Sequence, residues 1–493
     1  MDSATLPLYH QLATRYRRAI DDGALTPGDR MPSVRQLMER HGVSLSTALQ
    51  ACRELEREGL LEARPRSGYF VRRRPQPARA APIAEPEARL PDPAQYVGIH
   101  QRISAILARS HQHAVRVSLA GLSAASDLYP VAALNAATTR ALRRHPQLYG
   151  RTPEAEGHPE LRAALARHAL LSQINLAPED IVVTHGCTEA LHLALRAVAG
   201  PGDVIAVESP TYYGLLQILE GLGMRALEIP CSPHSGISLE ALELAAQTYD
   251  SIKAVVVVPT LQNPLGSIMP DANKAALVRW CETRGIVLIE DDCFSALADG
   301  ETGPAAAKSW DQSGNVIYCA SLHKFLAPGM RLGWIAAGRW TARVAMLKFS
   351  QSRPNEVLAQ LAVADFMGSG AFARHLRRLR DQLRIQREWM AEAIAGGFPA
   401  GTRLSTPAGG MHLWVELPAG IDSETLFELA LRQGIHVAPG VMFSNSNRFD
   451  HFLRVNCGAP RSALLEDALR RLAAVANGLA AARPEPAPNV TLT

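Results

Sequence analysis

A lysine and an arginine that follow a short apolar run suggest the chemistry of this chain. Residues 315–320, NVIYCA, are mostly β-branched, aromatic or small apolar residues between turn signals, which predicts a buried strand. Lys324 follows this strand, and Arg331 comes after the turn Pro328-Gly329. A lysine amine can form a Schiff base with a phosphorylated carbonyl compound, while Ser321 and Arg331 hold its phosphate. A solvated loop lysine beside a surface arginine is the alternative that these residues allow.

Similar apolar runs occur throughout residues 97–480 and alternate with amphipathic stretches. This pattern predicts an α/β domain with a mostly parallel sheet. The runs are DIVVTHG, DVIAVES, AVVVVPT, GIVLIEDD, NVIYCAS and RLGWIAAG. Ligands of such sheets bind beyond the carboxyl ends of the strands, so polar residues at these ends should share one site.

Several polar residues lie at the ends of the first four runs. They are Gly186, Cys187, Thr188, Tyr212, Asn263 and Asp291. Gly186 to Thr188 opens a helix, where backbone amides and a hydroxyl can receive phosphate oxygens. Taken singly, each residue has an ordinary alternative: a helix-capping glycine turn, a core tyrosine, an Asn-Pro turn or a capping carboxylate.

Residues 321–334, SLHKFLAPGMRLGW, resemble the S-x-x-K-x-x-x-P-G-x-R-x-G-W segment of fold-type I pyridoxal-phosphate proteins, the aspartate aminotransferase superfamily. The resemblance implies pyridoxal 5'-phosphate as cofactor, with Lys324 as the catalytic lysine that holds it as an aldimine. It further implies that Tyr212 stacks on the cofactor ring, that Asn263 bonds the phenolic oxygen, and that Asp291 pairs with the pyridine nitrogen.

Three further positions follow from the same resemblance. Residues 451–458, HFLRVNCG, match the segment whose arginine grips a substrate carboxylate, which assigns this role to Arg454; a structural salt bridge is the alternative. Tyr149 resembles the tyrosine that reaches the cofactor phosphate of a neighbouring subunit, which would make the chain a homodimer. Phe294 departs from the family pattern, because a tyrosine commonly stands there and bonds the phenolic oxygen.

Residues 1–74 have a different pattern. Apolar residues at helical spacing predict helices over 7–22, from 33 to about 40, and from 44 to about 58, followed by two strands around a turn at 65–68. Three helices and a basic hairpin describe a winged helix-turn-helix, whose third helix enters the major groove of DNA. A small helical interaction domain is the alternative.

The string from L-x-P-G-D-R-M-P-S-V-R-Q-L to R-S-G-Y-F-V closely resembles the DNA-binding domain of GntR-type regulators over residues 6–71. The resemblance and the chemistry of hydroxyls and guanidinium groups assign DNA contacts to six residues. These are Ser33, Arg35, Ser44, Ser46, Thr47 and Arg66. Leu45 stands where many relatives have arginine, so one phosphate contact is lost.

Charge and composition agree with this division. Residues 1–74 contain 13 arginines, no lysine and 9 acidic residues, a balance of +4, whereas the rest contains 38 basic and 38 acidic residues. A basic module on a neutral body suggests a polyanionic partner. The 7 cysteines are scattered and never form a C-x-x-C pair, so we expect neither a disulfide framework nor a zinc site, and we assign no metal ligand.

The predicted organisation has four parts. Residues 1–74 form the winged helix-turn-helix, 75–96 a linker rich in proline and alanine, 97–480 the aminotransferase-like domain and 481–493 a disordered tail. No apolar run is long enough to span a membrane, and the first residues do not look like a signal peptide. We therefore expect a cytoplasmic protein.

Together the two resemblances describe MocR-type transcriptional regulators of bacteria. The first hypothesis is a regulator that binds a double-stranded DNA operator and senses a small amino compound, which exchanges with Lys324 on the cofactor while Arg454 selects a carboxylate. An active aminotransferase that uses an amino acid and a 2-oxo acid is the second hypothesis. The complete winged helix and Phe294 weigh against it. A dimerisation scaffold without cofactor is disfavoured, because so many cofactor-contacting residue types are present.

Overall fold

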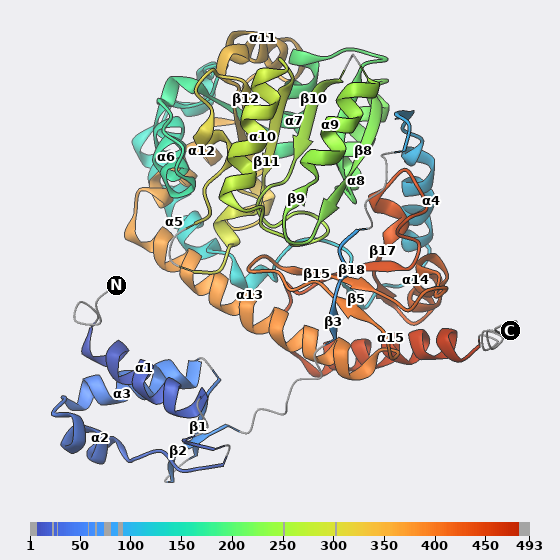
Figure 1. Ribbon diagram of the computed structural model, residues 1–493. Helices are drawn as coiled ribbons and strands as arrows, with labels where there is room; N and C mark the ends of the chain where they lie inside the picture. The colour runs from blue at the N-terminus through green and yellow to red at the C-terminus, as the bar shows by residue number, and fades with distance from the viewer. Residues whose placement is uncertain are drawn as a thin grey trace, which may run out of the picture. The chain divides into compact units, whose positions relative to one another are not determined.

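The computed structural model describes residues 7–21, 24–26, 28–57, 59–64, 67–72, 80–86, 92–249, 252–300 and 303–482. The chain divides into two compact units, Met1–Arg79 and Ala80–Thr493 (Figure 1). Arg66 and most of the predicted tail lie outside the described residues. No helix among the described residues is long and apolar enough to cross a membrane.

The described residues of the N-terminal unit form three helices and a hairpin. The helices are α1 (Leu8–Asp21), α2 (Val34–His41) and α3 (Leu45–Arg57), and the antiparallel strands are β1 (Leu61–Arg64) and β2 (Gly68–Val71). Leu12 of α1, Leu55 of α3 and Val71 of β2 are buried in one core because each element has an apolar face. The predicted winged helix-turn-helix is confirmed.

The start and the end of α2 are set by local side chains and backbone. Ser33 caps the first turn: its Oγ accepts from the backbone amide of Gln36, whose side chain accepts from the amide of Ser33 in return. Gly42, at φ +62°, ends the helix in the left-handed region that glycine adopts without strain. Ser44 then begins α3 and accepts from the amide of Thr47.

The large unit is built around a nine-stranded sheet (Figure 1). Its main path runs β4-β8-β7-β10-β11-β12-β13-β6, and β9 pairs with β8. The strands are β4 (Gln95–Tyr96), β6 (Ile181–Thr184), β7 (Val204–Ser209), β8 (Arg225–Ser232), β9 (Gly236–Ile237), β10 (Ile252–Val257), β11 (Val287–Asp292), β12 (Val316–Ser321) and β13 (Gly333–Ala336). Pairing from β8 to β12 along this path is parallel, whereas β13 is antiparallel to both its neighbours.

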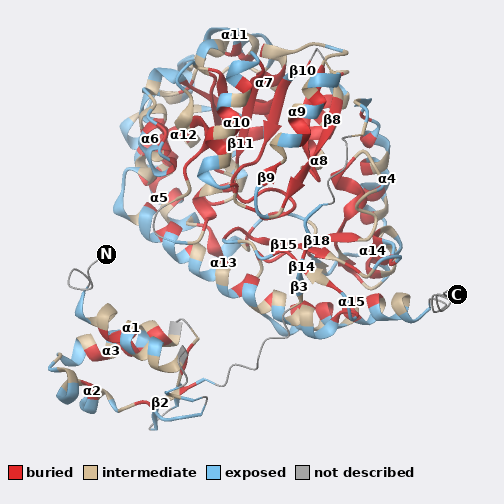
Figure 2. Cartoon of the chain, viewed as in Figure 1, coloured by how far each residue is buried: buried red, intermediate tan, exposed pale blue. Residues whose placement is uncertain are grey.

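Both faces of this sheet are buried (Figure 2). Ile205 and Val207 belong to one hydrophobic cluster, while the alternating Val204 and Ala206 belong to another. Alternate side chains point to opposite faces of a strand, so the nearly continuous apolar sequence of β7 reflects two packed faces. The helices in this part of the chain are α4 (Ile99–His111), α5 (Val131–Arg144), α6 (Pro159–Ala169), α7 (Cys187–Val198), α8 (Tyr213–Gly221), α9 (Leu239–Thr248), α10 (Asp271–Thr283), α11 (Thr341–Gln351) and α12 (Val357–Met367).

A five-stranded sheet forms the second layer of this unit, in the order β17-β18-β15-β14-β3. Its strands are β3 (Ala81–Pro82), β14 (Arg403–Leu404), β15 (His412–Glu416), β17 (Ala438–Pro439) and β18 (Phe452–Asn456). The helices α13 (Gly370–Gly397), α14 (Ser423–Arg432) and α15 (Ala463–Ala481) lie beside it in Figure 1. A small pair, β5 (Val117–Ser118) with β16 (Ile435–His436), completes the strands of the described chain.

The structure differs from the predicted linker over residues 75–96. Ala81–Pro82 pairs with β14, and Gln95–Tyr96 pairs with β8, so each adds an edge strand to a sheet of the large unit. Residues 87–91 and 75–79 lie outside the described residues. A prediction from composition fails here because a two-residue strand has no hydrophobic period and is fixed by the neighbouring strand.

Candidate functional site

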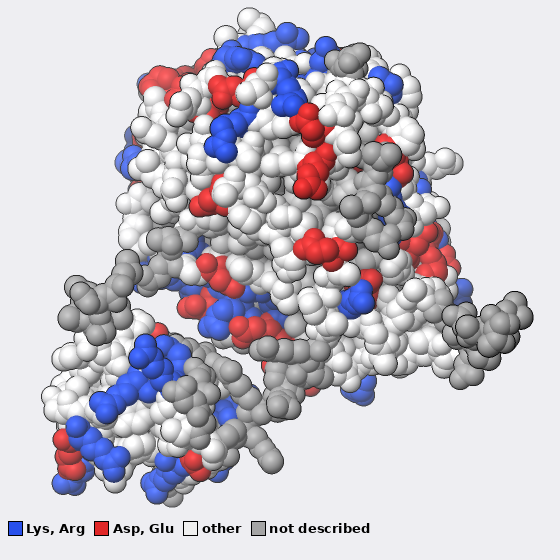
Figure 3. Space-filling model, viewed as in Figure 1, with Lys and Arg blue, Asp and Glu red and all other residues white. Residues whose placement is uncertain are grey.

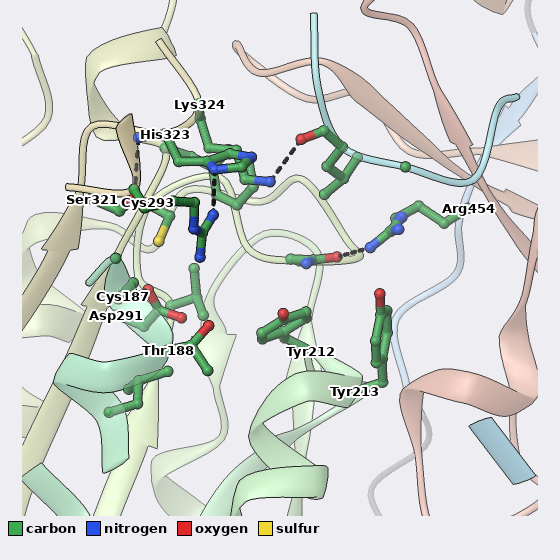
Figure 4. A pocket seen from close by; sticks show the side chains of 18 residues that line it. Cys187, Thr188, Tyr212, Tyr213, Asp291, Cys293, Ser321, His323, Lys324 and Arg454 are labelled. Carbon is green, nitrogen blue, oxygen red and sulfur yellow. Dashed lines mark hydrogen bonds between the residues drawn. The ribbon is translucent and has the colours of Figure 1, made fainter. Parts of the chain in front are cut away.

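Ten of the predicted site residues line a single cavity of about 240 Å³ in the large unit (Figure 4). They are Gly186, Cys187, Thr188, Tyr212, Asn263, Asp291, Ser321, Lys324, Arg331 and Arg454. They come from the ends of β6, β7, β11 and β12, from the loop after β10 and from β18. The arrangement follows from the parallel core of the sheet, which brings the carboxyl ends of these strands to one edge.

One end of the cavity has the features of a phosphate site. The N-terminus of α7 contributes Cys187 and Thr188, and Ser321 and Arg331 line the same cavity. Gly186 has φ +80°, a conformation that favours glycine, and a Cβ there would lie 3.1 Å from Nη2 of Arg331, so a side chain would crowd this guanidinium. Helix amides, hydroxyls and a guanidinium together suit a dianionic group.

His323 supports Arg331 at this end. Nη1 of Arg331 donates to Nδ1 of His323 at 2.8 Å, which requires that nitrogen to be unprotonated. Burial, together with the charges of Lys324 and Arg331, lowers the pKa of His323 to about 4. The imidazole is therefore neutral near pH 7, and it orients the guanidinium without adding a charge.

Lys324 lies partly buried between the two ends of the cavity. Its Nζ donates to the carbonyl oxygen of Leu122 at 2.6 Å and lies 5.7 Å from the ring centroid of Phe294. Burial lowers the pKa of Lys324 to about 8, far enough for a substantial neutral fraction at neutral to mildly alkaline pH. A neutral amine is the nucleophile that attack on a carbonyl requires.

Asp291 and two thiols form the floor of the cavity. The Asp291 side chain is buried, and its Oδ1 accepts from Sγ of Cys187 at 3.1 Å. Burial raises the pKa of Asp291, although the thiol hydrogen bonds oppose this effect. A buried carboxylate of this kind suits a protonated ring nitrogen, whose positive charge would favour the ionised form.

Sequence reasoning missed the neighbourhood of Cys187 and Cys293. Their sulfur atoms and one oxygen of Asp291 lie within 4.8 Å of one another, a donor set that could hold a metal ion. Hydrogen bonding to Cys293 and burial raise the pKa of Cys187 well above its ordinary value, so this thiol is a hydrogen-bond donor to Asp291. No motif could have shown the pair, because the two cysteines are brought together by separate strand ends.

Arg454 occupies the opposite end of the cavity from Asp291 in the view of Figure 4. Its side chain is 3% exposed; Nη1 donates to Oδ1 of Asn263 at 2.8 Å, and Nη2 donates to the carbonyl oxygen of Ala120 at 2.6 Å. Burial lowers the pKa of Arg454 to about 10. The Nε atom has no hydrogen-bond partner among the described residues, which leaves a buried donor for an anionic ligand.

Aromatic side chains surround this end. The guanidinium of Arg454 lies 4.8 Å from the ring centroid of Phe443, and the rings of Tyr212 and Tyr213 are 5.1 Å apart. Burial raises the pKa of Tyr212, so its phenol stays protonated. Tyr213 and Leu122 line the cavity but were not predicted; Tyr213 had a signal in its neighbour Tyr212, whereas Leu122 acts through its backbone.

Tyr149 does not join this cavity, and Phe294 lines it where the family pattern has a tyrosine. Tyr149 lies in the short helix η3 (Leu148–Gly150), its side chain is 77% exposed, and it does not line the cavity. Its expected role concerns a second subunit and stays a prediction. Phe294 does line the cavity, buried against His412, so the tyrosine hydroxyl of the family pattern is replaced here by an apolar ring.

The predicted DNA-contacting residues of the described chain lie at or just before the starts of α2 and α3. Oγ of Ser44 is hydrogen-bonded to the hydroxyls of Ser46 and Thr47, each at 2.9 Å. Arg35 has a side chain that is 88% exposed, and its Nε donates to Glu39 at 3.2 Å. Figure 3 shows further basic side chains on the visible face of this unit. Leu45 is exposed between these polar groups.

The arrangement defines a class of protein: a winged helix-turn-helix unit followed by a fold-type I aminotransferase unit. Residues 8–71 match the family of bacterial regulatory proteins, gntR family, and residues 121–472 match aminotransferase class I and II. The chain belongs to the aminotransferase class I and II family, with the N-terminal gntR-type domain that gives it a MocR-type architecture.

Known proteins with the same arrangement include two regulators. The chain is 37% identical to the uncharacterized HTH-type transcriptional regulator YjiR of Escherichia coli, over 94% of this chain and 97% of the relative. It is 28% identical to the probable rhizopine catabolism regulatory protein MocR of Rhizobium meliloti, over 88% of this chain and 87% of the relative.

Among solved structures, LysN of Thermus thermophilus, an alpha-aminoadipate aminotransferase complexed with N-(5'-phosphopyridoxyl)-L-leucine, has a TM-score of 0.70. Its identity is 28%, and the match covers 77% of this chain and 95% of that one. The cofactor of this family is pyridoxal 5'-phosphate. The residues described above fit it: an anion site at the α7 N-terminus, a buried carboxylate and a lysine of lowered pKa.

Proposed function

We propose that this regulator senses a small amino compound at Lys324 and converts its binding into a change in DNA binding. The observation that supports the proposal is the cavity itself, in which a lysine of lowered pKa and a buried arginine with an unpartnered Nε in the described chain lie within reach of one small molecule. When bound, pyridoxal 5'-phosphate would supply an electrophilic carbon for the amine of Lys324 or of an incoming compound, and a ring that can act as an electron sink.

The residues of the chain have separate roles in this proposal. Thr188, Ser321 and Arg331 bind the phosphate group, and Asp291 accepts from the protonated ring nitrogen. Arg454 binds the carboxylate of the incoming compound and therefore selects amino acids over simple amines. Lys324, when displaced, keeps a hydrogen-bond acceptor in the carbonyl oxygen of Leu122.

DNA binding is assigned to the N-terminal unit. Ser33, Ser44, Ser46 and Thr47 lie where hydroxyls and helix amides can meet phosphates, and Arg35 can address a phosphate or a guanine edge. The partner is a double-stranded operator in the cytoplasm, bound by a homodimer. Sensing requires that the effector and the DNA each bind two conformations of this dimer with different affinity.

An aminotransferase remains the second candidate because Lys324, Asp291, Asn263 and Arg454 are all in place. Some relatives carry such names: the Thermus thermophilus relative named 2-aminoadipate transaminase is 29% identical over 74% of this chain and 91% of its own length. Phe294 weighs against efficient turnover, because no phenol is available there to hold the phenolic oxygen of the cofactor.

The two candidates are separated by one experiment on the full-length protein with its cofactor. The absorbance spectrum is recorded after addition of each member of a panel of amino acids and amines, and DNA affinity is measured with the same compounds. A regulator gives a new spectrum that persists and a DNA affinity that changes with it. An aminotransferase gives a spectrum that decays steadily and is restored by a keto acid, with DNA affinity unchanged.

A further inference from the structure

A second cavity of about 430 Å³ lies in the large unit and shares no lining residue with the cofactor cavity. It is bounded by the ends of β7 and β8, by residues 83–86, and by Trp414, Glu416 and Phe452 from β15 and β18. We propose that this cavity, called here the ammonium cavity, binds a small organic ammonium ion with an aromatic or aliphatic body. A bound ion displaces the side chains that surround Arg454.

One wall of the ammonium cavity is aromatic. Trp414 stacks on Phe452 with 5.1 Å between ring centroids and an interplanar angle of 14°, and Phe449 packs edge-on against Phe452 at 5.5 Å. Trp414 and Phe452 are buried. Aromatic faces attract cations and also favour flat apolar groups, so the wall suits an organic cation better than a hydrated inorganic one.

The charges that line the cavity favour a cation as well. Glu85 and Glu416 contribute two carboxylates. Arg448, the one arginine of the described chain in the lining, is paired with Asp92 at 2.8 Å, so its charge is balanced outside the cavity lining. The other titratable lining groups in the described chain are His451, 3.9 Å from Oε1 of Glu416, and the buried thiol Cys231.

Glu416 supplies a specific acceptor. Oε1 lies 3.7 Å from Nη1 of Arg403 and 3.9 Å from Nε2 of His451, both long contacts. Oε2 is buried and has no hydrogen-bond partner among the described residues. A buried carboxylate oxygen without a donor is costly, and an ammonium ion bound beside this carboxylate would offset its negative charge.

Contacts behind the cavity connect it to the cofactor site. Trp414 packs against Phe443 at 5.2 Å, and Phe443 lies under the guanidinium of Arg454 at 4.8 Å. Gln262, next to Asn263 in the chain, donates to the carbonyl oxygen of Pro210 and accepts from the amide of Leu265, and both of these residues line the ammonium cavity. A ligand that moves Trp414 or Leu265 therefore displaces neighbours of Arg454 and Asn263.

The test uses N,N-dimethylphenethylamine as probe, because a tertiary amine cannot form a Schiff base with the cofactor. Binding to the full-length, cofactor-loaded protein is measured by isothermal titration calorimetry, beside N,N-dimethylphenylacetamide, a neutral molecule of similar shape. We expect saturable binding of one probe per chain, at least about tenfold tighter than the amide, since an ammonium gains both the carboxylate and the aromatic wall. Absence of saturable binding, or equal affinity for the neutral amide, would overturn the proposal.

Two variants test whether the probe binds in the ammonium cavity. Glu416→Gln keeps the shape of the side chain and removes its charge, and should weaken probe binding about tenfold. Ala84→Trp, at an exposed position of the lining, should block the cavity without disturbing a core. Glu243→Gln is the matched control, because Glu243, like Glu416, forms an ion pair with an arginine but lies outside the cavity. Unchanged affinity in both Glu416→Gln and Ala84→Trp would refute the site.

The link to Arg454 has its own readout and rests on the proposed function. With the probe at saturation, the concentration of an amino acid that gives half of the spectral change should shift severalfold, and Ala84→Trp should abolish this shift while keeping the response to the amino acid. The same half-saturation with and without probe would overturn the link. An amino acid that causes no spectral change in the absence of probe contradicts the proposed function instead, and the calorimetry still decides the ammonium cavity.

Discussion

The two units place their functional side chains in opposite environments. In the N-terminal unit the candidate contacts Ser33, Arg35, Ser44 and Ser46 are exposed. Arg35 is almost fully open to solvent and pairs with a neighbouring glutamate on the same helix. In the large unit Arg454 and Asp291 are buried, and Lys324 is partly so. An exposed guanidinium acts through its charge and its reach, whereas burial changes what a group can do chemically.

The two environments also predict different losses of binding when a side chain is removed. Removing an exposed contact weakens a sum of similar contacts with the phosphate backbone, and the loss is gradual. Removing a buried group leaves its partners without a donor or acceptor inside a closed cavity, and the loss is large. The following experiments compare the two kinds of site, and the size of the expected effect falls from one to the next.

Replacement of Lys324 by alanine should abolish covalent attachment of the cofactor, because no other lysine lines the cavity in the described chain. Affinity for bare DNA should stay within a factor of about two, since the winged helix has its own core. Absorbance spectra and fluorescence anisotropy with labelled DNA measure the two effects. Lys253→Ala, at an exposed position of β10, is the control. An unchanged absorbance band in Lys324→Ala would refute the assignment.

The motif around this lysine explains how much could be predicted. A single segment orders Ser321, Lys324 and Arg331, so their meeting at one strand end followed from the sequence. The strand ends that carry Asp291 and Asn263 could be placed beside it because parallel strands share an edge. The winged helix could be predicted equally well, because its helix caps and apolar faces are local sequence signals.

Features that depend only on tertiary packing could not be predicted from the sequence. The strands β3 and β4 come from a segment rich in proline and alanine and exist only because β14 and β8 offer an edge. Cys293 lies against Cys187 through tertiary contacts, and Leu122 meets Lys324 through a backbone carbonyl that any residue would supply. Tyr149 depends on a second subunit, and its role stays a prediction.

The pH dependence of cofactor uptake tests the buried environment of Lys324 directly. Burial lowers its pKa from 10.5 to about 8, so the neutral amine becomes abundant two or more pH units earlier than in an exposed lysine. The rate of uptake by cofactor-free protein should rise about 50-fold between pH 6 and pH 8 and level off above pH 9, following the neutral fraction. Stopped-flow absorbance gives the profile, and a rate still climbing at pH 10 would contradict the shift.

The lowered pKa of Lys324 also makes the free energy of unfolding depend on pH. Because the folded-state pKa lies below the unfolded value, the cost of burying the ammonium is fully present below about pH 8. As the pH rises from 8 toward 10.5, the folded protein has lost this proton while the unfolded chain still holds it. The free energy of unfolding of the cofactor-free protein therefore increases over this pH range. Urea denaturation of Lys324→Met beside the parent chain isolates the contribution, which should be absent in the variant.

Arg454→Met should weaken the response to an amino acid by at least about 30-fold, because a buried, charge-assisted contact with the carboxylate is lost. The response to an amine of the same length without a carboxylate should change little. Arg454→Lys keeps the charge but loses the two-pronged geometry and should be intermediate. Spectral titration gives all three affinities. Equal losses for the amino acid and the amine would show that Arg454 holds Asn263 and the fold of the cavity rather than the effector.

Arg35→Ala should weaken DNA binding about tenfold and reduce the slope of log affinity against log salt concentration by about one. Glu39→Gln is the matched variant, since it removes the carboxylate that competes for this guanidinium and should leave the affinity equal or slightly higher. Anisotropy titrations over a range of salt concentrations give the affinity and the slope. An unchanged slope in Arg35→Ala would place this side chain away from the phosphates.

Phe294→Tyr should have the smallest effect and tests the boundary between sensing and turnover. Phe294 is 4% exposed and lines the cofactor cavity, and its ring centroid lies 5.7 Å from Nζ of Lys324, so the substitution adds a polar atom at the wall of this cavity. A few-fold faster decay of the spectrum with an amino acid is expected, because the phenol can hold a developing charge beside the amine. DNA affinity should not change. Decay as slow as in the parent chain would mean that the aromatic ring at this position does not limit turnover, and that the persistence of the bound compound has its cause in the buried contacts of Arg454 and Asp291.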